Sequence, residues 1–228
     1  MTSNSENTIY IPVYNGEEFL DDMLNRIEEL DYLEEIKIID DCSTDSTNEI
    51  LEEWGERGLD FVTMEKNGQK IGSIKNVLEE DFENGELSEY VILHDADCFL
   101  HTEGENGSLK NGNLRNALDK SIDFMKKMEW HGMALKDVPH LDEESNFLER
   151  AQYKEYMWDR AFHYRLGKAG RMRCIPGAGG IYKSDALLDA LNNHSLRHDG
   201  DDMETTALMQ RSGYKVGYYT KGWLKIWI

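Results

Sequence analysis

The sequence of 228 residues is short of positive charge. It holds 25 lysines and arginines against 45 aspartates and glutamates, a formal net charge of -20 at pH 7. Because nucleic-acid binding depends on neutralising phosphates with basic side chains, a chain this acidic is not expected to bind DNA or RNA. A phosphate-bearing small ligand would meet the same repulsion unless a local cation shields it, which favours a metal site.

Long apolar runs and paired cysteines are also missing. No stretch approaches the roughly 20 apolar residues of a membrane-spanning helix, and the first eight residues are polar, without a signal-peptide pattern. The three cysteines, Cys42, Cys98 and Cys174, lie far apart without metal-ligand spacing, so they are interpreted as reduced thiols of a cytoplasmic protein. The apolar segment Gly222–Ile228 is interpreted as a final strand, an interfacial anchor or the edge of a longer protein. We therefore expect the protein in the cytoplasm or at the cytoplasmic face of a membrane.

What the sequence does contain is an alternation of short apolar runs with helical patterns. Strands are expected at 9–13, 36–39, 59–64, 90–93, 132–138 and 216–219. Helices are expected at 19–30, after Ser46, from 71, and at 114–130, 147–165, 184–191 and 203–213. Such alternation predicts an α/β fold with a mainly parallel central sheet flanked by helices. Ser46 with Glu49 three residues later has the pattern of a capping box.

Two carboxylates directly follow the fourth predicted strand. Asp95 and Asp97 are separated by one alanine and come after the apolar run Tyr90–Leu93. Carboxylates at the end of a buried strand are costly unless something positive joins them, and a hard divalent cation with phosphate oxygens is the natural partner. The alternative is a solvated acidic turn.

Other polar side chains fall at the ends of neighbouring predicted strands. Tyr14 follows the first strand and Asp41 the second. In a parallel sheet, ligands bind beyond the carboxyl ends of the strands. Tyr14, Asp41 and the Asp95–Asp97 pair are therefore expected at one crevice, and this convergence favours the functional interpretation over the solvated turn.

Glycines, aromatic residues and a second acidic cluster occur later in the chain. Gly177, Gly179 and Gly180 indicate unusual dihedral angles or the close approach of another molecule. The aromatic side chains of the helix at 147–165 are interpreted as core, with an acceptor groove as the alternative. Tyr182 and Trp158 are candidates for stacking on a ligand.

In chain order these motifs resemble those of family 2 glycosyltransferases with the GT-A fold, enzymes that move a sugar from a nucleotide sugar to an acceptor. The matching segments are Ile11–Asn15, Ile38–Thr47, Asn67–Asn76, Asp95–Asp97 and Gly200–Thr205. The last is similar to the catalytic motif of the cellulose, chitin and hyaluronan synthase-like branch, although the Gln-x-x-Arg-Trp motif and membrane helices of that branch are not present. The resemblance implies a single GT-A domain over residues 1–228, with a nucleotide-binding half at 1–100 and an acceptor-binding and catalytic half at 101–228.

The resemblance also implies a role for each motif residue. Asp95 and Asp97 would bind Mn²⁺ or Mg²⁺, and Asp95 would also contact the ribose. Asp202 would be the general base that takes the proton of the acceptor hydroxyl. The neighbouring carboxylates compete with Asp202 for this role. The alternative without any catalytic role is that this acidic cluster stabilises a helix N-terminus. These competitors are Asp199, Asp201 and Glu204.

The remaining implied contacts are to the nucleotide and the acceptor. Nucleotide-binding residues would be Pro12, Tyr14, Asn15, Asp41, Lys70 and Asp95, and acceptor-binding residues would be Gly179, Gly180 and Asp201. Asp41 can accept from a ring N–H, which suits uracil, or it caps the following turn. Lys70 would meet the diphosphate as a point charge, or it is a solvated loop lysine. His94 and His198 are not assigned as metal ligands, because a lone histidine is more often structural.

The expected function is an inverting, metal-dependent glycosyltransferase of hexosyltransferase type. Its donor is expected to be a UDP-sugar and its acceptor a carbohydrate or lipid-linked hydroxyl, in polysaccharide or glycoconjugate synthesis. One alternative is a non-catalytic nucleotide- or carbohydrate-binding subunit, which would have no need of the base Asp202. The other is a nucleotidyltransferase, which usually opens with a Gly-rich basic loop that Ile9–Glu17 lacks.

Overall fold

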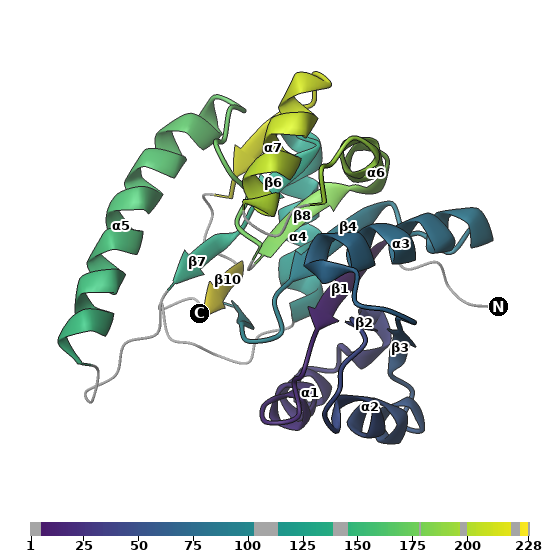
Figure 1. Ribbon diagram of the computed structural model, residues 1–228. Helices are drawn as coiled ribbons and strands as arrows, with labels where there is room; N and C mark the ends of the chain where they lie inside the picture. Colours follow the sequence, from purple (N-terminus) through teal and green to yellow (C-terminus); the bar gives the residue numbers. More distant parts are fainter. Residues whose placement is uncertain are drawn as a thin grey trace.

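A computed structural model describes residues 6–102, 114–138, 146–177, 179–196, 200–219 and 224–227 (Figure 1). The strands are β1 (Asn7–Val13), β2 (Ile36–Asp40), β3 (Asp60–Thr63), β4 (Tyr90–His94), β5 (Phe99–Thr102), β6 (Gly132–Ala134), β7 (Lys136–Val138), β8 (Gly179–Lys183), β9 (Val216–Tyr218) and β10 (Leu224–Trp227). The α-helices are α1 (Leu20–Glu29), α2 (Thr47–Gly55), α3 (Gln69–Asn84), α4 (Leu114–Lys127), α5 (Phe147–Lys168), α6 (Ser184–Asn192) and α7 (Asp201–Arg211).

A central sheet of seven strands organises the chain, in the order β3-β2-β1-β4-β8-β6-β9. Neighbouring strands are parallel except at β8, which is antiparallel to both β4 and β6. The predicted α/β fold with a mainly parallel sheet is therefore confirmed. The sheet draws strands from both predicted halves of the chain, 1–100 and 101–228.

Side chains along the strands alternate between two apolar layers. In β1, Ile9 and Ile11 pack in one layer with the helices α1, α2 and α4, whereas Tyr10 packs in the other layer with α3, α6 and α7. This is the two-residue period of an extended strand that is buried on both faces. The two layers leave the carboxyl ends of the parallel strands free to form a site.

A second, smaller sheet has the order β5-β10-β7. The segment 132–138 was predicted as one strand, and this is wrong because it forms β6 in the central sheet and β7 in the small one. The chain changes sheet at Leu135, whose side chain is buried and whose N–H bonds to the carbonyl of Gly179 at 3.2 Å. The strand interpretation of the apolar segment 222–228 holds for the described residues 224–227, which form β10.

The start of α2 differs from the predicted capping box. Ser46 occupies the N-cap position but its side chain makes no capping bond. The carboxylate of Asp45 instead accepts from the N–H of Thr47 at 3.1 Å and from its hydroxyl at 2.6 Å. A charged oxygen is a stronger acceptor than a serine hydroxyl, so Asp45 takes the capping role.

The helix α5 lies at the outer edge of the molecule, away from α1 and α2 (Figure 1). Its aromatic residues were predicted to be core, and this is wrong for Trp158, which is 80% exposed. The helix approaches the sheet near its C-terminal end, where a methyl group on Gly167 would lie 2.3 Å from Cβ of Tyr218. The side chains of Tyr156 and Phe162 lie outside the described residues.

Two predicted absences can be compared with the described residues. All three cysteines are free thiols, as expected. Within the part of the chain that the structure describes, no helix combines the length and the apolar character needed to cross a membrane.

Candidate active site

A pocket of about 630 Å³ opens beyond the carboxyl ends of β1, β2 and β4. Of the residues predicted to bind nucleotide or metal, Pro12, Tyr14, Asp41, Lys70, Asp95 and Asp97 line it. The expected convergence of the three strand ends is therefore observed. Phe19, Asn67 and Gln69 also line the pocket and were not assigned from the sequence. The side chains of these three residues carry no distinctive chemistry. Only the position of Asn67 and Gln69 close to Lys70 in the sequence indicated that they could lie at the site.

Asn15 is the predicted nucleotide-binding residue that does not line the pocket. Its backbone N–H donates to the hydroxyl of Ser43 at 2.9 Å, and its side-chain oxygen accepts from the N–H of Thr44 at 2.8 Å. These bonds join the loop after β1 to the loop after β2. Asn15 thus shapes the rim of the pocket, and direct contact with a nucleotide stays a prediction.

Three non-glycine residues at the rim have left-handed backbone conformations. The φ angles are 53° at Asn15, 64° at Cys42 and 59° at Gln69. Each such residue costs on the order of 1–3 kcal/mol and persists only when its surroundings fix it. Strain of this kind clusters at ligand sites, and here it marks the three loops that border one pocket.

Asp41 fixes the loop that leads into α3. Its Oδ1 atom accepts from the N–H of Gly68 at 2.7 Å and from the hydroxyl of Ser73, and its side chain is almost fully buried. Asn67 adds a bond from its side-chain amide to the carbonyl of Asp41 at 3.1 Å. One carboxylate oxygen of Asp41 is therefore committed to holding the start of α3, although the residue also borders the pocket.

Lys70 lies in the first turn of α3 and forms an ion pair with Asp95. The distance from Nζ of Lys70 to Oδ1 of Asp95 is 2.5 Å. Burial opposes the charged form of this ammonium, but the nearby carboxylates of Asp95 and Asp202 outweigh it and raise the pKa of Lys70. Lys70 is the one basic residue among the described residues that line the pocket.

The predicted metal ligands fit a hard divalent cation. Ligand atoms of Asp95, Asp97 and Cys98 lie within 4.8 Å of one another. Burial, together with the charges of Asp97 and Asp95, raises the pKa of the Cys98 thiol, so it stays protonated. The usable donors are carboxylate oxygens, which suit Mn²⁺ or Mg²⁺. Neither ring nitrogen of the buried His94 has a hydrogen-bond partner, and burial lowers the pKa of His94 to about 4.

Asp202 lies at the start of α7, near Lys70. Its Oδ2 atom accepts from the N–H of Gly177 at 2.7 Å. A methyl group on Gly177 would lie 2.4 Å from Nζ of Lys70 and 2.8 Å from both carboxylate oxygens of Asp202, so ammonium and carboxylate flank the same side of this glycine. Burial raises the pKa of Asp202. Lys70 and the Gly177 N–H oppose this rise, whereas Asp201 and Asp95 add to it, and the net shift of the pKa is upward.

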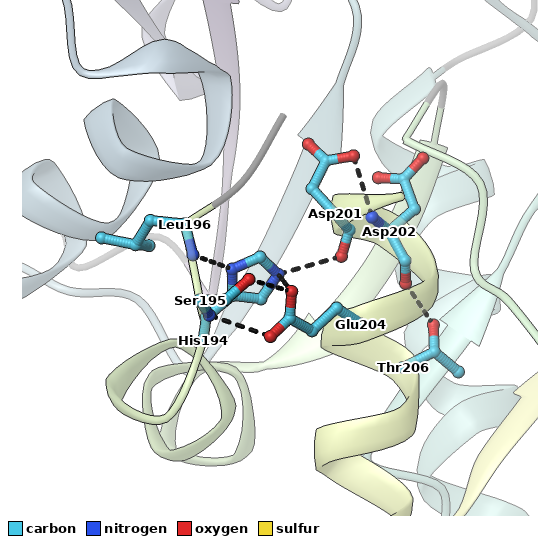
Figure 2. A network of polar contacts seen from close by, with 7 residues as sticks. All are labelled: His194, Ser195, Leu196, Asp201, Asp202, Glu204 and Thr206. Atoms are coloured by element: carbon cyan, nitrogen blue, oxygen red, sulfur yellow. Dashed lines mark hydrogen bonds and ion pairs between the residues drawn. The ribbon is translucent and has the colours of Figure 1, made fainter. Parts of the chain in front are cut away.

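Two of the competing carboxylates, those of Glu204 and Asp201, accept hydrogen bonds of their own, as Figure 2 shows. Glu204 accepts from both the N–H and the hydroxyl of Ser195, at 2.9 Å and 2.5 Å. His194 accepts from the N–H of Leu196 through Nδ1, so its Nε2–H donates to the carbonyl of Asp201. The Oδ1 atom of Asp201 accepts from the N–H of Asp202 at 2.9 Å. Residues 197–199, which include the predicted competitor Asp199 and the unassigned His198, lie outside the described residues.

The glycines predicted to meet the acceptor lie within the sheet. Gly179 and Gly180 are buried in β8. A methyl group on Gly180 would lie 2.5 Å from Ile175 and 2.7 Å from the ring of Tyr182, so packing alone accounts for a glycine there. Tyr182 is 2% exposed and therefore not free to stack on a sugar. The glycine that borders the charged cluster is Gly177.

Comparison with known proteins agrees with this geometry. Residues 8–104 match the model of the family described as Glycosyl transferase family 2. Poly(ribitol-phosphate) β-N-acetylglucosaminyltransferase TarS of Staphylococcus aureus is 29% identical over 100 residues, which are 42% of this chain and 17% of TarS. The chain thus spans about a sixth of the length of this curated relative.

Solved structures resemble the chain over nearly all of its length. The mannosyltransferase PcManGT from Pyrobaculum calidifontis, in complex with GDP-Man and Mn²⁺, has a TM-score of 0.68 at 18% identity, covering 100% of this chain and 57% of that one. S. aureus TarS in complex with UDP has a TM-score of 0.60 at 15% identity, covering 98% of this chain and 61% of that one. The chain has a GT-A fold, and the resemblance to family 2 glycosyltransferases is confirmed through residues 8–104. The nearer likeness to the synthase-like branch stays a prediction.

Asp41 offers a first testable prediction. Asp41→Ala leaves the N–H of Gly68 without its acceptor and removes one of the two acceptors of the Ser73 hydroxyl, which also lies 2.9 Å from the carbonyl of Gln69. This is expected to lower the free energy of unfolding by about 1–3 kcal/mol. Asp41→Asn keeps an acceptor oxygen in place and is expected to lose less than half as much. Urea unfolding of the three proteins measures this difference. Equal stability of wild type and Asp41→Ala would show that Asp41 does not hold the loop.

Proposed function

We propose that this chain is a metal-dependent, inverting glycosyltransferase that uses a nucleotide sugar, with UDP as the first candidate nucleotide. The observation that supports the proposal is the grouping of Tyr14, Asp41, Lys70 and the Asp95–Asp97 pair around one pocket, with Asp202 near Lys70. A pure binding subunit needs the first group of residues but not a carboxylate at the position of Asp202.

The donor would lie along the carboxyl ends of β1, β2 and β4. The half-exposed ring of Tyr14 offers a surface for a base, and the uncommitted oxygen of Asp41 is an acceptor for a base N–H. Lys70 and the N-terminus of α3 both favour an anion, so the diphosphate would lie against them, beside Asp95. Mn²⁺ or Mg²⁺ held by Asp95 and Asp97 would neutralise the charge that develops on the leaving diphosphate.

The reacting hydroxyl would meet Asp202. This carboxylate accepts the hydroxyl proton as the oxygen attacks the anomeric carbon, and its raised pKa makes it a stronger base than an ordinary aspartate. Attack from the face opposite the diphosphate, with a single base, inverts the configuration. Lys70, whose charge acts on both Asp95 and Asp202, limits the repulsion between the base and the donor site.

The acceptor is proposed to be a carbohydrate or lipid-linked hydroxyl. Asp201 borders the base and is the predicted acceptor contact that fits this position. Association with the cytoplasmic face of a membrane and a role in polysaccharide or glycoconjugate synthesis are further parts of the proposal.

Nucleotide binding tests the donor site directly. Thermal unfolding is measured with UDP, GDP, CDP and ADP, each with and without Mn²⁺. A ligand at a hundredfold its Kd stabilises by about 2.7 kcal/mol, which for this size raises Tm by roughly 2–4 °C per kcal/mol. We expect Mn²⁺-dependent stabilisation by UDP that is lost in Asp97→Asn and kept in Asp123→Asn, an exposed acid of α4 outside the pocket. Nucleotide binding without any metal requirement would make Asp95–Asp97 a solvated turn.

Asp202→Asn tests the chemistry. Release of UDP from the donor is expected to fall about 10²–10⁴-fold, the usual contribution of a general base, while Mn²⁺–UDP binding is retained. Because the base must be deprotonated, wild-type turnover should fall with decreasing pH through a pKa above that of an ordinary aspartate, about 3.9. Full turnover by Asp202→Asn would mean that another residue is the base, and loss in Asp201→Asn or Glu204→Gln alone would identify it. Nucleotide binding without turnover by the wild type would favour a non-catalytic nucleotide-binding subunit.

Lys70 is expected to compete with the metal ion for Asp95. Lys70→Met should bind Mn²⁺ alone on the order of tenfold more tightly, which corresponds to about 1.4 kcal/mol, and should bind UDP more weakly because the diphosphate loses its ammonium partner. Electron paramagnetic resonance of free Mn²⁺ measures the first effect. Lys75→Met removes the same charge from the same helix, where Lys75 pairs with Glu79 at 3.6 Å, and should match wild type. Unchanged Mn²⁺ affinity in Lys70→Met would disprove the competition.

A further inference from the structure

The segment that precedes β8 is held against the first two turns of α7 by two backbone N–H groups. The N–H of Ile175 donates to the hydroxyl of Thr206 at 2.9 Å, and the N–H of Gly177 donates to the carboxylate of Asp202 at 2.7 Å. Pro176 lies between them and has no N–H to donate. Both donors of this segment are therefore directed at the helix that carries Asp202.

The hydroxyl of Thr206 makes a second bond. It donates to the backbone carbonyl of Asp202 at 2.9 Å, one turn earlier in the same helix, as Figure 2 shows. A hydroxyl has one donor and two acceptor sites, so Thr206 can give its proton to Asp202 and still accept from Ile175. A closed ring results, which runs from the Asp202 carboxylate through Gly177, Ile175 and the Thr206 hydroxyl back to the Asp202 carbonyl.

The position of Gly177 matters for the carboxylate because it determines which oxygen is occupied. Its N–H engages Oδ2 and stabilises the charged form, while Lys70 also favours that form and Asp201 and Asp95 oppose it. Gly177 is itself confined on the side of Lys70 and Asp202, where even a methyl group would not fit. A small displacement of Ile175 would therefore move the donor that orients Asp202.

We propose that Thr206 is a positioning residue for the general base: its hydroxyl ties Ile175 to α7 and so keeps the Gly177 N–H on Oδ2 of Asp202. This inference rests on the proposed function and deepens it. Thr206 is 1% exposed and does not itself reach the pocket, so its effect on catalysis passes through Asp202.

The neighbouring Thr205 provides a matched control. It is 2% exposed, as deeply buried as Thr206, but its hydroxyl has no hydrogen-bond partner among the residues that the structure describes. Replacing either residue by valine removes one hydroxyl at nearly constant shape. Only Thr206→Val should disconnect Ile175 and Gly177 from α7, whereas Thr205→Val should be neutral or slightly stabilising.

The test combines three measurements on the wild type, Thr206→Val, Thr206→Ser and Thr205→Val. In Thr206→Val we expect faster amide exchange at Ile175 and Gly177, a higher pKa of Asp202 by carboxyl ¹³C NMR, and kcat for UDP release lowered about tenfold or more with KM for the donor within a factor of two. The acid limb of the pH profile should move to higher pH, because the lost N–H no longer favours the carboxylate. Thr206→Ser keeps the hydroxyl and should restore all three values, and Thr205→Val should match wild type.

Wild-type kcat and an unchanged Asp202 pKa in Thr206→Val would overturn the proposal, and so would an equal loss in Thr205→Val. If Thr206→Val does not fold, Thr206→Ala is measured in the same way. A failure of the proposed function can be distinguished from a failure of this inference. If Asp202→Asn retains turnover, Asp202 is not the base, yet the exchange rates and the Asp202 pKa still report whether Thr206 holds Gly177 in place.

Discussion

The ion pair between Lys70 and Asp95 is the interaction on which the site depends. Four carboxylates gather near one ammonium in a chain with a net charge of -20: Asp95, Asp97, Asp201 and Asp202. Without the ammonium, the ends of β4 and α7 would repel each other across the pocket. The carboxylates in turn raise the pKa of Lys70. The ammonium opposes the effect of burial on Asp202, so the pKa of Asp202 rises less than burial alone would raise it. A single positive charge thus joins the donor-binding strand ends to the helix that carries the candidate base.

Much of this arrangement was predictable because it depends on local patterns and one topological rule. Apolar runs in β1, β2 and β4 identify strands buried on both faces, and parallel strands bring their carboxyl ends to one edge. Any acid that directly follows such a run therefore reaches the same crevice. That reasoning is enough to place Asp41, Asp95 and Asp97, whereas the assignment of Lys70 rests on the resemblance to the family.

Other features depend on partners that are distant in the sequence. The break at Leu135 arises because β7 pairs with β10, and no local pattern reports that pairing. The bond from the Ile175 N–H to Thr206 likewise joins two segments that are separate in the sequence. The glycine cluster shows the same limit of local reasoning, because composition cannot tell Gly177, which borders the charges, from Gly180, which makes room for Tyr182.

The pairing of β5 with β10 sets an order of assembly. Thr102, shortly after the paired carboxylates, lies opposite Leu224. During synthesis β1 to β4 emerge early and can pair with one another, since domains form from the N-terminus onward. The strand that follows Asp97 cannot find this partner until residues 224–227 have been made, and closing so long a loop is entropically unfavourable until the partner is present. The pocket wall that carries the two carboxylates is therefore expected to become rigid last, after the sheet from which it extends.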